Sequence, residues 1–262
     1  MKPAAALILG GLMVSSAAAV DLKPETVQAF DRYVRDTETR LDQRLLPGAT
    51  FLWVDEDPQR LVQVRQGQVA IGNRNNKDTV AVPGGLIHDW IGTVFIPGAG
   101  LEKVLALVQD YDRNQDNYKP EVLASRLAGR SGNDFKVYLR LMKKKVITVI
   151  LDTDYDVRYF PMSGGRSRSR AYSTRIAEVE DAGKPEERLL PPGHDDGFLW
   201  RLYTYWRFQE RDGGVYVECE AISLTRGIPS GLGWLVQPII TTLPRESLAN
   251  TLRETRAAYG RN

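Results

Sequence analysis

Cysteine and histidine are scarce in this sequence of 262 residues, which contains one cysteine, Cys219, and two histidines. A single cysteine excludes an internal disulfide, so packing alone must stabilise the fold in an oxidising compartment. His88 and His194 lie in different segments, without the close histidine or cysteine spacing of a zinc site. The sequence therefore predicts no metal ion and no cofactor.

Net charge and long apolar runs are scarce as well. The chain carries 35 basic and 33 acidic residues, a net charge of +2, which argues against general binding to nucleic acid. No stretch approaches the roughly 20 apolar residues that span a bilayer. Phosphate-binding loops, dinucleotide fingerprints and serine-nucleophile motifs are missing too, so none of these catalytic signatures is present. Hydrophobic residues make up 42% of the chain, which is enough for a substantial core.

Residues 1–19 have the layout of a secretory signal peptide. One lysine is followed by a short apolar run at 4–14 and then by small residues that end in Ala17, Ala18 and Ala19. This layout predicts cleavage after Ala19 and a secreted or periplasmic protein. An uncleaved membrane anchor is the alternative.

Residues 20–84 are interpreted as an N-terminal extension. An amphipathic helix is predicted over 21–45, because apolar residues recur at helical spacing and Pro24 suits a first turn. Short strands are predicted at 51–54 and 60–73. The apolar stripe of the helix consists of Val27, Phe30, Val34, Leu41 and Leu45.

Residues 85–262 show the element order of the main domain. A strand at 86–96 precedes a helix at 101–120, which is followed by about six antiparallel strands. A final helix is expected to begin at Pro244. An antiparallel sheet with one buried face must cover that face, and the last helix is the available cover.

Three segments carry a resemblance to a known superfamily, namely IPGAGLEKVLALVQDYDRNQDNYKPEV, YWRFQERDGGVYVECEAISLTRGIP and LPRESLANTLRETRAA. In wording and order they resemble the START-like superfamily, also called SRPBCC or helix-grip, over residues 85–262. The resemblance implies an α+β fold in which a curved antiparallel sheet wraps around a long C-terminal helix. It also implies a deep apolar cavity, which in this superfamily binds lipids, sterols or aromatic polyketides, and a minority of members are cyclases or hydrolases.

The hairpin at 203–221 allows the inner face of the sheet to be predicted. Asp212 and Gly213 suit a type I′ turn, which pairs Trp206 with Cys219 and divides the hairpin into an apolar and a charged face. Because burying unpaired carboxylates is costly, the apolar face is expected to be the concave one. The predicted cavity-lining residues are Leu139, Leu141, Val149, Leu151, Tyr155, Ser169, Ala171, Ser173, Thr204, Trp206, Cys219, Ala221, Leu248 and Leu252.

The opposite face of the sheet is expected to be a solvated surface of paired charges, including Glu218 and Glu220. An alternative places Tyr205, Arg207 and Glu220 in the cavity, as a polar anchor for a ligand or as the catalytic groups of a cyclase. Along two neighbouring strands, an outer ladder of opposite charges is predicted. It sets Asp152, Asp154 and Asp156 against Arg166, Arg168 and Arg170.

The sequence thus favours a secreted or periplasmic protein that binds a lipid-like or aromatic apolar molecule, with no catalytic residue assigned. The alternatives are a cyclase or hydrolase of the same superfamily and a structural or interaction domain without a ligand. Cys219 is interpreted as a buried small hydrophobe rather than a nucleophile. The expected partner is a hydrophobic small molecule or lipid, with no nucleic acid and at most transient contact with a membrane surface, and we expect a monomer.

Overall fold

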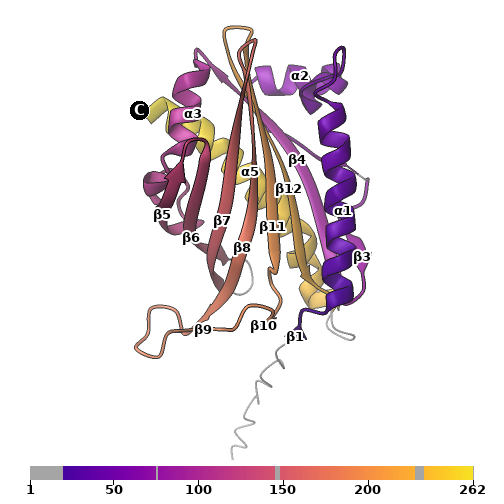
Figure 1. The fold of residues 1–262 in the computed structure, drawn as a ribbon, viewed down its shortest axis with the longest axis vertical. Helices are drawn as coiled ribbons and strands as arrows, with labels where there is room; N and C mark the ends of the chain where they lie inside the picture. Colours follow the sequence, from indigo (N-terminus) through magenta and orange to yellow (C-terminus); the bar gives the residue numbers. More distant parts are fainter. Residues whose placement is uncertain (1–19, 75, 145–147, 228–232, 262) are drawn as a thin grey trace, which may run out of the picture.

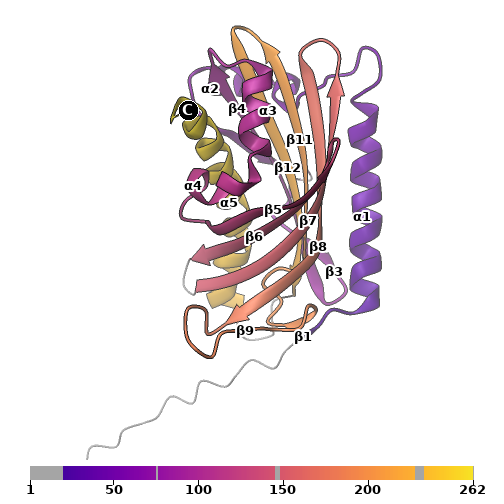
Figure 2. The same ribbon diagram turned by 60° about the vertical axis from the view of Figure 1, so that its left-hand side comes forward.

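The computed structural model describes residues 20–74, 76–144, 148–227 and 233–261. Within these ranges it contains a strongly curved ten-stranded antiparallel sheet with helices on both faces (Figures 1 and 2). The main strands follow the spatial order β2 (Ala70–Asn73), β4 (Gly85–Pro97), β12 (Gly214–Arg226), β11 (Arg201–Arg211), β8 (Arg166–Glu180), β7 (Thr148–Met162), β6 (Asp134–Lys144) and β5 (Val122–Ser131). Two short strands join the sheet, β3 (Val80–Val82) beside β4 and β9 (Arg188–Leu189) beside β8.

Helices cover the two faces of the sheet unequally. The long helix α5 (Gly233–Arg261) crosses the concave face, and α1 (Pro24–Gln43) runs along the convex face (Figure 2). Between β4 and β5 the chain forms α3 (Leu101–Gln109) and α4 (Asn114–Asn117), which pack beside α5. This arrangement confirms the predicted α+β helix-grip fold. No helix in the described ranges is long and apolar enough to cross a bilayer.

The predicted N-terminal helix is confirmed as α1, which buries an apolar stripe that includes Phe30, Val34 and Leu41. Two strands of the N-terminal extension, β2 and β3, pair with β4, so backbone hydrogen bonds join the extension to the main sheet. The first strand, β1 (Val20–Asp21), pairs with β10 (His194–Asp195) at one end of the molecule. The domain boundary at residue 84 stays a prediction.

The prediction of strands at 51–54 and 60–73 is wrong for most of their length. The first segment lies at the start of the 3-10 helix η1 (Trp53–Glu56), and the second begins as α2 (Pro58–Arg65) before it becomes β2. The cause is a local start signal for a helix: the Asp57 carboxylate accepts a hydrogen bond from the backbone N–H of Gln59 at 2.9 Å, and a proline fills the first helical position.

The predicted helix at 101–120 is broken into α3, the 3-10 turn η2 (Tyr111–Arg113) and α4. Side chains of this segment bond the backbone of β5 instead of facing solvent. The Gln115 side chain accepts a hydrogen bond from the backbone N–H of Ser125, and the Ser125 hydroxyl accepts one from the backbone N–H of Gln115, each at 3.0 Å. These side chain to backbone bonds tie the connection to the edge strand and explain why it does not continue as one straight helix.

The start of the last helix is also corrected. α5 begins at Gly233, whereas the sequence predicts a start at Pro244. A proline inside a helix removes one N–H donor and disturbs the preceding turn, but tertiary packing can hold the helix on both sides of it. The C-terminal half of α5 packs tightly, because Leu248 and Leu252 are buried.

The hairpin of β11 and β12 has the predicted register. Trp206 pairs with Cys219, and the two turn residues Asp212 and Gly213 both have positive φ, 56° and 72°. Alternation from this turn puts the apolar face of the hairpin on the concave side, where it joins a core cluster with Leu248 of α5.

The charged face of the hairpin is not solvated, contrary to the prediction. Glu218 and Glu220 are 2% and 1% exposed, because α1 and the loop after it cover the convex face here. Arg40 of α1 forms an ion pair with Glu220, and Arg44 lies 3.3 Å from Glu218. The carboxylates are therefore buried but paired, which is the condition under which burial is tolerated.

The predicted ladder of opposite charges between β7 and β8 is wrong, because its aspartates and arginines do not pair with each other. The turn between β7 and β8 pairs Met162 with Arg166, and the same register places Arg158 opposite Arg170, so that like charges face each other. Arg170 instead pairs with Asp42 of α1 at 2.6 Å, and Asp154 pairs with Arg175 at 2.6 Å. The arginines of β8 thus help to hold α1 against the sheet.

Candidate ligand cavity

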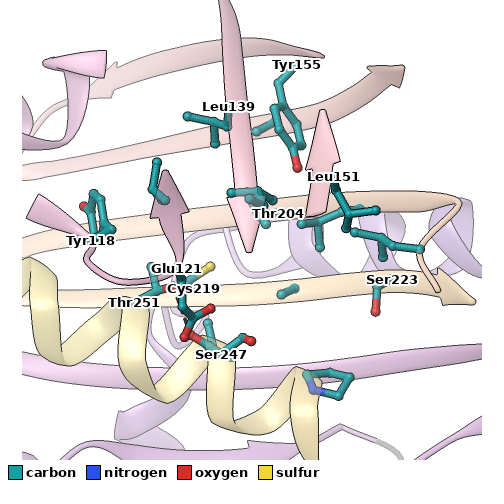
Figure 3. Close-up of a pocket in the computed structure, with 18 of the residues that line it drawn as sticks. Tyr118, Glu121, Leu139, Leu151, Tyr155, Thr204, Cys219, Ser223, Ser247 and Thr251 are labelled. Atoms are coloured by element: carbon teal, nitrogen blue, oxygen red, sulfur yellow. Dashed lines mark hydrogen bonds between the residues drawn. The ribbon is translucent and has the colours of Figure 1, made fainter. Parts of the chain in front are cut away.

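A cavity of about 320 Å³ lies between the concave face of the sheet and α5 (Figure 3). Its walls come from strands β4–β8, β11 and β12, from the α3–α4 connection and from the second half of α5. Valine, leucine and aromatic side chains form most of the surface. The curvature of the sheet creates this space, because small side chains on β8 and β12 leave room beneath the helix.

Twelve of the fourteen residues predicted to line a cavity line this one. They are Leu139, Leu141, Val149, Leu151, Tyr155, Ser169, Ala171, Thr204, Trp206, Cys219, Ala221 and Leu248. The structure does not bring the other two, Ser173 and Leu252, to this cavity. The hydroxyl of Ser173 accepts a hydrogen bond from the backbone N–H of Leu202 at 3.0 Å, and Leu252 is fully buried in the solid core beside β4. A role of the twelve in ligand binding stays a prediction.

Sequence reasoning missed the part of the wall that comes from outside the hairpin and its neighbours. Trp90 on β4 points inward, which strand alternation around the predicted strand at 86–96 could have indicated. Tyr111 and Tyr118 come from the broken connection after α3, and no pattern in the sequence places them.

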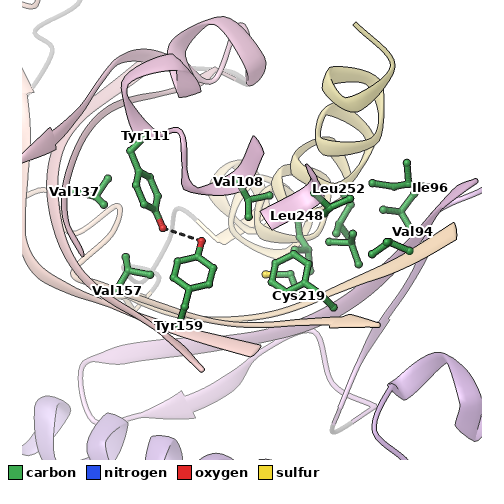
Figure 4. Close-up of a cluster of buried hydrophobic side chains, with 14 of the residues drawn as sticks. Val94, Ile96, Val108, Tyr111, Val137, Val157, Tyr159, Cys219, Leu248 and Leu252 are labelled. Carbon is green, nitrogen blue, oxygen red and sulfur yellow. Dashed lines mark hydrogen bonds between the residues drawn. The ribbon is translucent and has the colours of Figure 1, made fainter. Parts of the chain in front are cut away.

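A hydrogen-bonded pair of tyrosines, Tyr111 and Tyr159, closes one side of the cavity, with 3.0 Å between the hydroxyl oxygens (Figure 4). Burial raises the pKa of Tyr159 well above its ordinary value and the pKa of Tyr155 to about 12. These phenols remain neutral near pH 7 and can donate or accept hydrogen bonds. Trp90 Nε1 and Asn114 Oδ1 also line the cavity and are buried without a hydrogen-bond partner among the described residues.

An ion pair marks another part of the wall. The ammonium group of Lys143 on β6 pairs with Glu121 and donates to the hydroxyl of Ser247 on α5 at 2.9 Å. Asn250, one turn further along α5, donates to the second oxygen of Glu121 at 2.8 Å. Figure 3 shows Glu121 and Ser247 side by side at the helix. This is the charged part of a lining that is otherwise mostly apolar.

One end of the cavity is closed by Phe198 and Leu199, which lie in the segment before β11. The Glu178 carboxylate holds this segment, because it accepts hydrogen bonds from the backbone N–H of Phe198 at 2.9 Å and of Asp196 at 3.1 Å. Burial raises the pKa of Glu178 from 4.5 to about 7. A carboxyl group outside the cavity therefore helps to position this end wall.

Cys219 lines the cavity but lacks the surroundings of a nucleophile. It is 1% exposed, and burial raises the pKa of its thiol well above the ordinary value, so the reactive thiolate is disfavoured. His88 pairs with Ser223, four residues along β12 from Cys219 and thus about 13 Å away at about 3.3 Å per residue. The interpretation of Cys219 as a buried apolar residue agrees with this geometry.

The alternative that placed Tyr205, Arg207 and Glu220 in the cavity is wrong. All three lie on the convex face, beneath α1. Arg207 donates to the backbone carbonyls of Leu41 at 2.6 Å and of Phe51 at 2.7 Å. Among the described residues no group of histidine, cysteine, aspartate and glutamate is arranged to hold a metal ion.

The fold and the cavity together define a helix-grip α+β protein. No protein-family model and no curated protein matches the chain. Similar solved structures include a STAR-related lipid transfer protein from Xanthomonas axonopodis, with 18% identity, 73% of this chain and 98% of that chain covered and a TM-score of 0.47. The Zhui aromatase/cyclase from Streptomyces has 10% identity, 67% and 94% coverage and a TM-score of 0.44.

A START superfamily protein from Mycobacterium smegmatis has 9% identity, with 66% of this chain and 98% of that chain covered and a TM-score of 0.44. Similarity at this level does not extend to a ligand or an activity.

Proposed function

We propose that this protein reversibly binds an apolar small molecule, lipid-like or aromatic, between the sheet and α5. The observation that carries the proposal is the apolar cavity of about 320 Å³, in which a few polar groups stand among valine, leucine and aromatic side chains. Ligand pockets commonly have volumes of about 300–1,000 Å³ and this mixture of lining groups. The volume suits one molecule of modest size.

Burial of the ligand supplies the driving force. A molecule that buries about 200 Å² of apolar surface gains about 5 kcal/mol at about 25 cal/mol per Å². The cavity is formed by strands and a helix that are already packed, so little ordering opposes binding. The unpartnered Trp90 Nε1 and Asn114 Oδ1, with the Lys143–Glu121 pair, offer hydrogen bonds that would orient a polar end of the ligand.

Filling the cavity tests this function. Ala221 is half-buried on β12, between Trp90 and Thr204 on the neighbouring strands, and all three side chains line the space. The variant Ala221→Trp should abolish saturable binding of the fluorescent probe N-phenyl-1-naphthylamine by protein stripped of co-purified molecules. Unfolding in urea should stay cooperative, because the indole occupies existing space.

The matched control is Ala106→Trp, the same substitution at an exposed position of α3. It should leave probe binding unchanged. Mass spectrometry of small molecules released from the native protein would identify the natural ligand. Equal probe binding by wild type and Ala221→Trp, or no saturable binding by either, would contradict the proposal.

The proposed site of action is outside the cytoplasm, in the periplasm or the medium. The A-x-A pattern at 17–19 supports export. A protein that carries an apolar molecule through water needs to shield it from solvent, which an internal cavity does. We propose that it acts as a monomer.

A further inference from the structure

A second hollow lies on the other side of the sheet, at the C-terminal end of α1. It has a volume of about 270 Å³, is open to solvent, and does not touch the ligand cavity. We call it the arginine groove, since three arginines dominate its lining. The residues on which its properties depend are Arg40, Gln43, Arg44, Thr50, Glu56 and Arg74.

Positive charge exceeds negative charge in this lining. Glu56 is its one carboxylate and is shared by two guanidinium groups, Arg44 at 3.1 Å and Arg74 at 3.0 Å. Arg40 Nη1 is buried and has no hydrogen-bond partner within the described ranges. The side chains of Arg40, Arg44 and Arg74 are 28%, 8% and 19% exposed, so solvent screens their charges less than it would on an open surface.

The buried side chains beneath the groove do not neutralise its excess of positive charge. Glu218 and Glu220 pair with Arg44 and Arg40, but a fourth guanidinium, that of Arg207, donates only to backbone carbonyls in the hydrogen bonds described above. The remaining acid there, Asp89, lies beside Glu220, and burial together with that neighbour raises its pKa well above the ordinary value. This disfavours a negative charge on Asp89.

The end of α1 does not repel an anion as a bare helix terminus would. Helix C-termini carry partial negative charge on their free carbonyl groups. Here the carbonyl of Leu41 accepts from Arg207, and the carbonyl of Thr50 accepts from Arg44 Nε at 3.2 Å. Guanidinium groups thus occupy these two backbone acceptors.

We propose that the arginine groove is a binding site for an oxyanion, the phosphate or carboxylate group of a small solute. Guanidinium groups form paired, charge-assisted hydrogen bonds with both kinds of anion. The anion would take the place of Glu56 on Arg74 and approach the unpartnered Nη1 of Arg40. The site is independent of the ligand cavity, which lies across the sheet.

Calorimetric titration with inorganic phosphate at constant ionic strength, set with chloride, tests the site. The wild-type protein should bind phosphate saturably at one site. Arg74→Gln should weaken the affinity by about tenfold or more, since hydrogen bonds to charged groups contribute about 1.5–3 kcal/mol. The control Arg188→Gln, which removes the same charge from an exposed pair with Glu180, should change it little.

The variant Glu56→Gln tests the proposal by the direction in which phosphate affinity changes. It removes the competing carboxylate, so phosphate should bind more tightly, while thermal stability in chloride should fall because Arg44 and Arg74 each lose one ion pair. Parallel titrations with acetate distinguish a carboxylate from a phosphate ligand. The proposal is overturned if the wild type shows no saturable binding, if Arg74→Gln and Arg188→Gln weaken binding equally, or if Glu56→Gln weakens it.

Discussion

Two leucines one turn apart on α5 should respond differently to truncation. Leu252 is fully buried, and its Cδ1 lies 2.7 Å from the position that a Cβ on Gly92 would take, so it touches the backbone of β4 directly. Leu248 is also buried but lines the ligand cavity. Replacing either by alanine removes three carbon atoms, worth about 2.4 kcal/mol at about 0.8 kcal/mol each.

The two variants should differ in the free energy that is lost when truncation leaves a void in the core. Leu252→Ala opens a new void in a close-packed region, which should bring the total loss to about 3–5 kcal/mol. Leu248→Ala enlarges a space that already exists, so its loss should stay near about 2 kcal/mol. Urea unfolding of ligand-free protein, followed by tryptophan fluorescence and circular dichroism, measures both. Equal losses, or a loss below about 1 kcal/mol for Leu252→Ala, would refute the proposed packing of α5.

Three further outcomes are expected. Because the raised pKa of Glu178 favours the protonated folded state, its contribution to stability is complete below pH 4.5 and is lost as the pH rises through about 7. The difference in unfolding free energy between wild type and Glu178→Gln should therefore fall across this range, and a constant difference would contradict the prediction. Taking the difference removes the contribution of His88, whose lowered pKa of about 4 makes stability rise with pH instead. Cys219 should react with a thiol reagent at a normal rate only after unfolding, and Cys219→Ser should retain probe binding. N-terminal sequencing of exported protein should start at Val20, whereas an intact Met1 would indicate an anchor.

The inner face of the sheet was predictable because one short turn fixes the hairpin. Once Asp212 and Gly213 define the register, strand alternation assigns every side chain of β11 and β12 to one face. Helical spacing is less informative: it places Leu248 and Leu252 on the same side of α5. Which of them meets the cavity depends on where the helix crosses the sheet, and the sequence does not contain that information.

The buried charges of the convex face were not predictable for a different reason. A strand face with glutamates is normally solvated, and the partners that make burial possible, Arg40 and Arg44, stand in a helix far away in the sequence. The same helix creates the arginine groove. By contrast, the start of α2 had a readable signal in Asp57 and Pro58, which strand-like alternation further along had obscured.

The pairing of β4 with β12 has a consequence for how the chain folds. Trp90 and Ala221 are direct neighbours in the sheet, and α5, which covers them, follows both strands in the chain. Such distant pairings make folding slow, because a long loop must close before any contact is gained. A nascent chain that ends before β12 has an open strand edge and no covering helix. We therefore expect the cavity to form only after α5 has been synthesised.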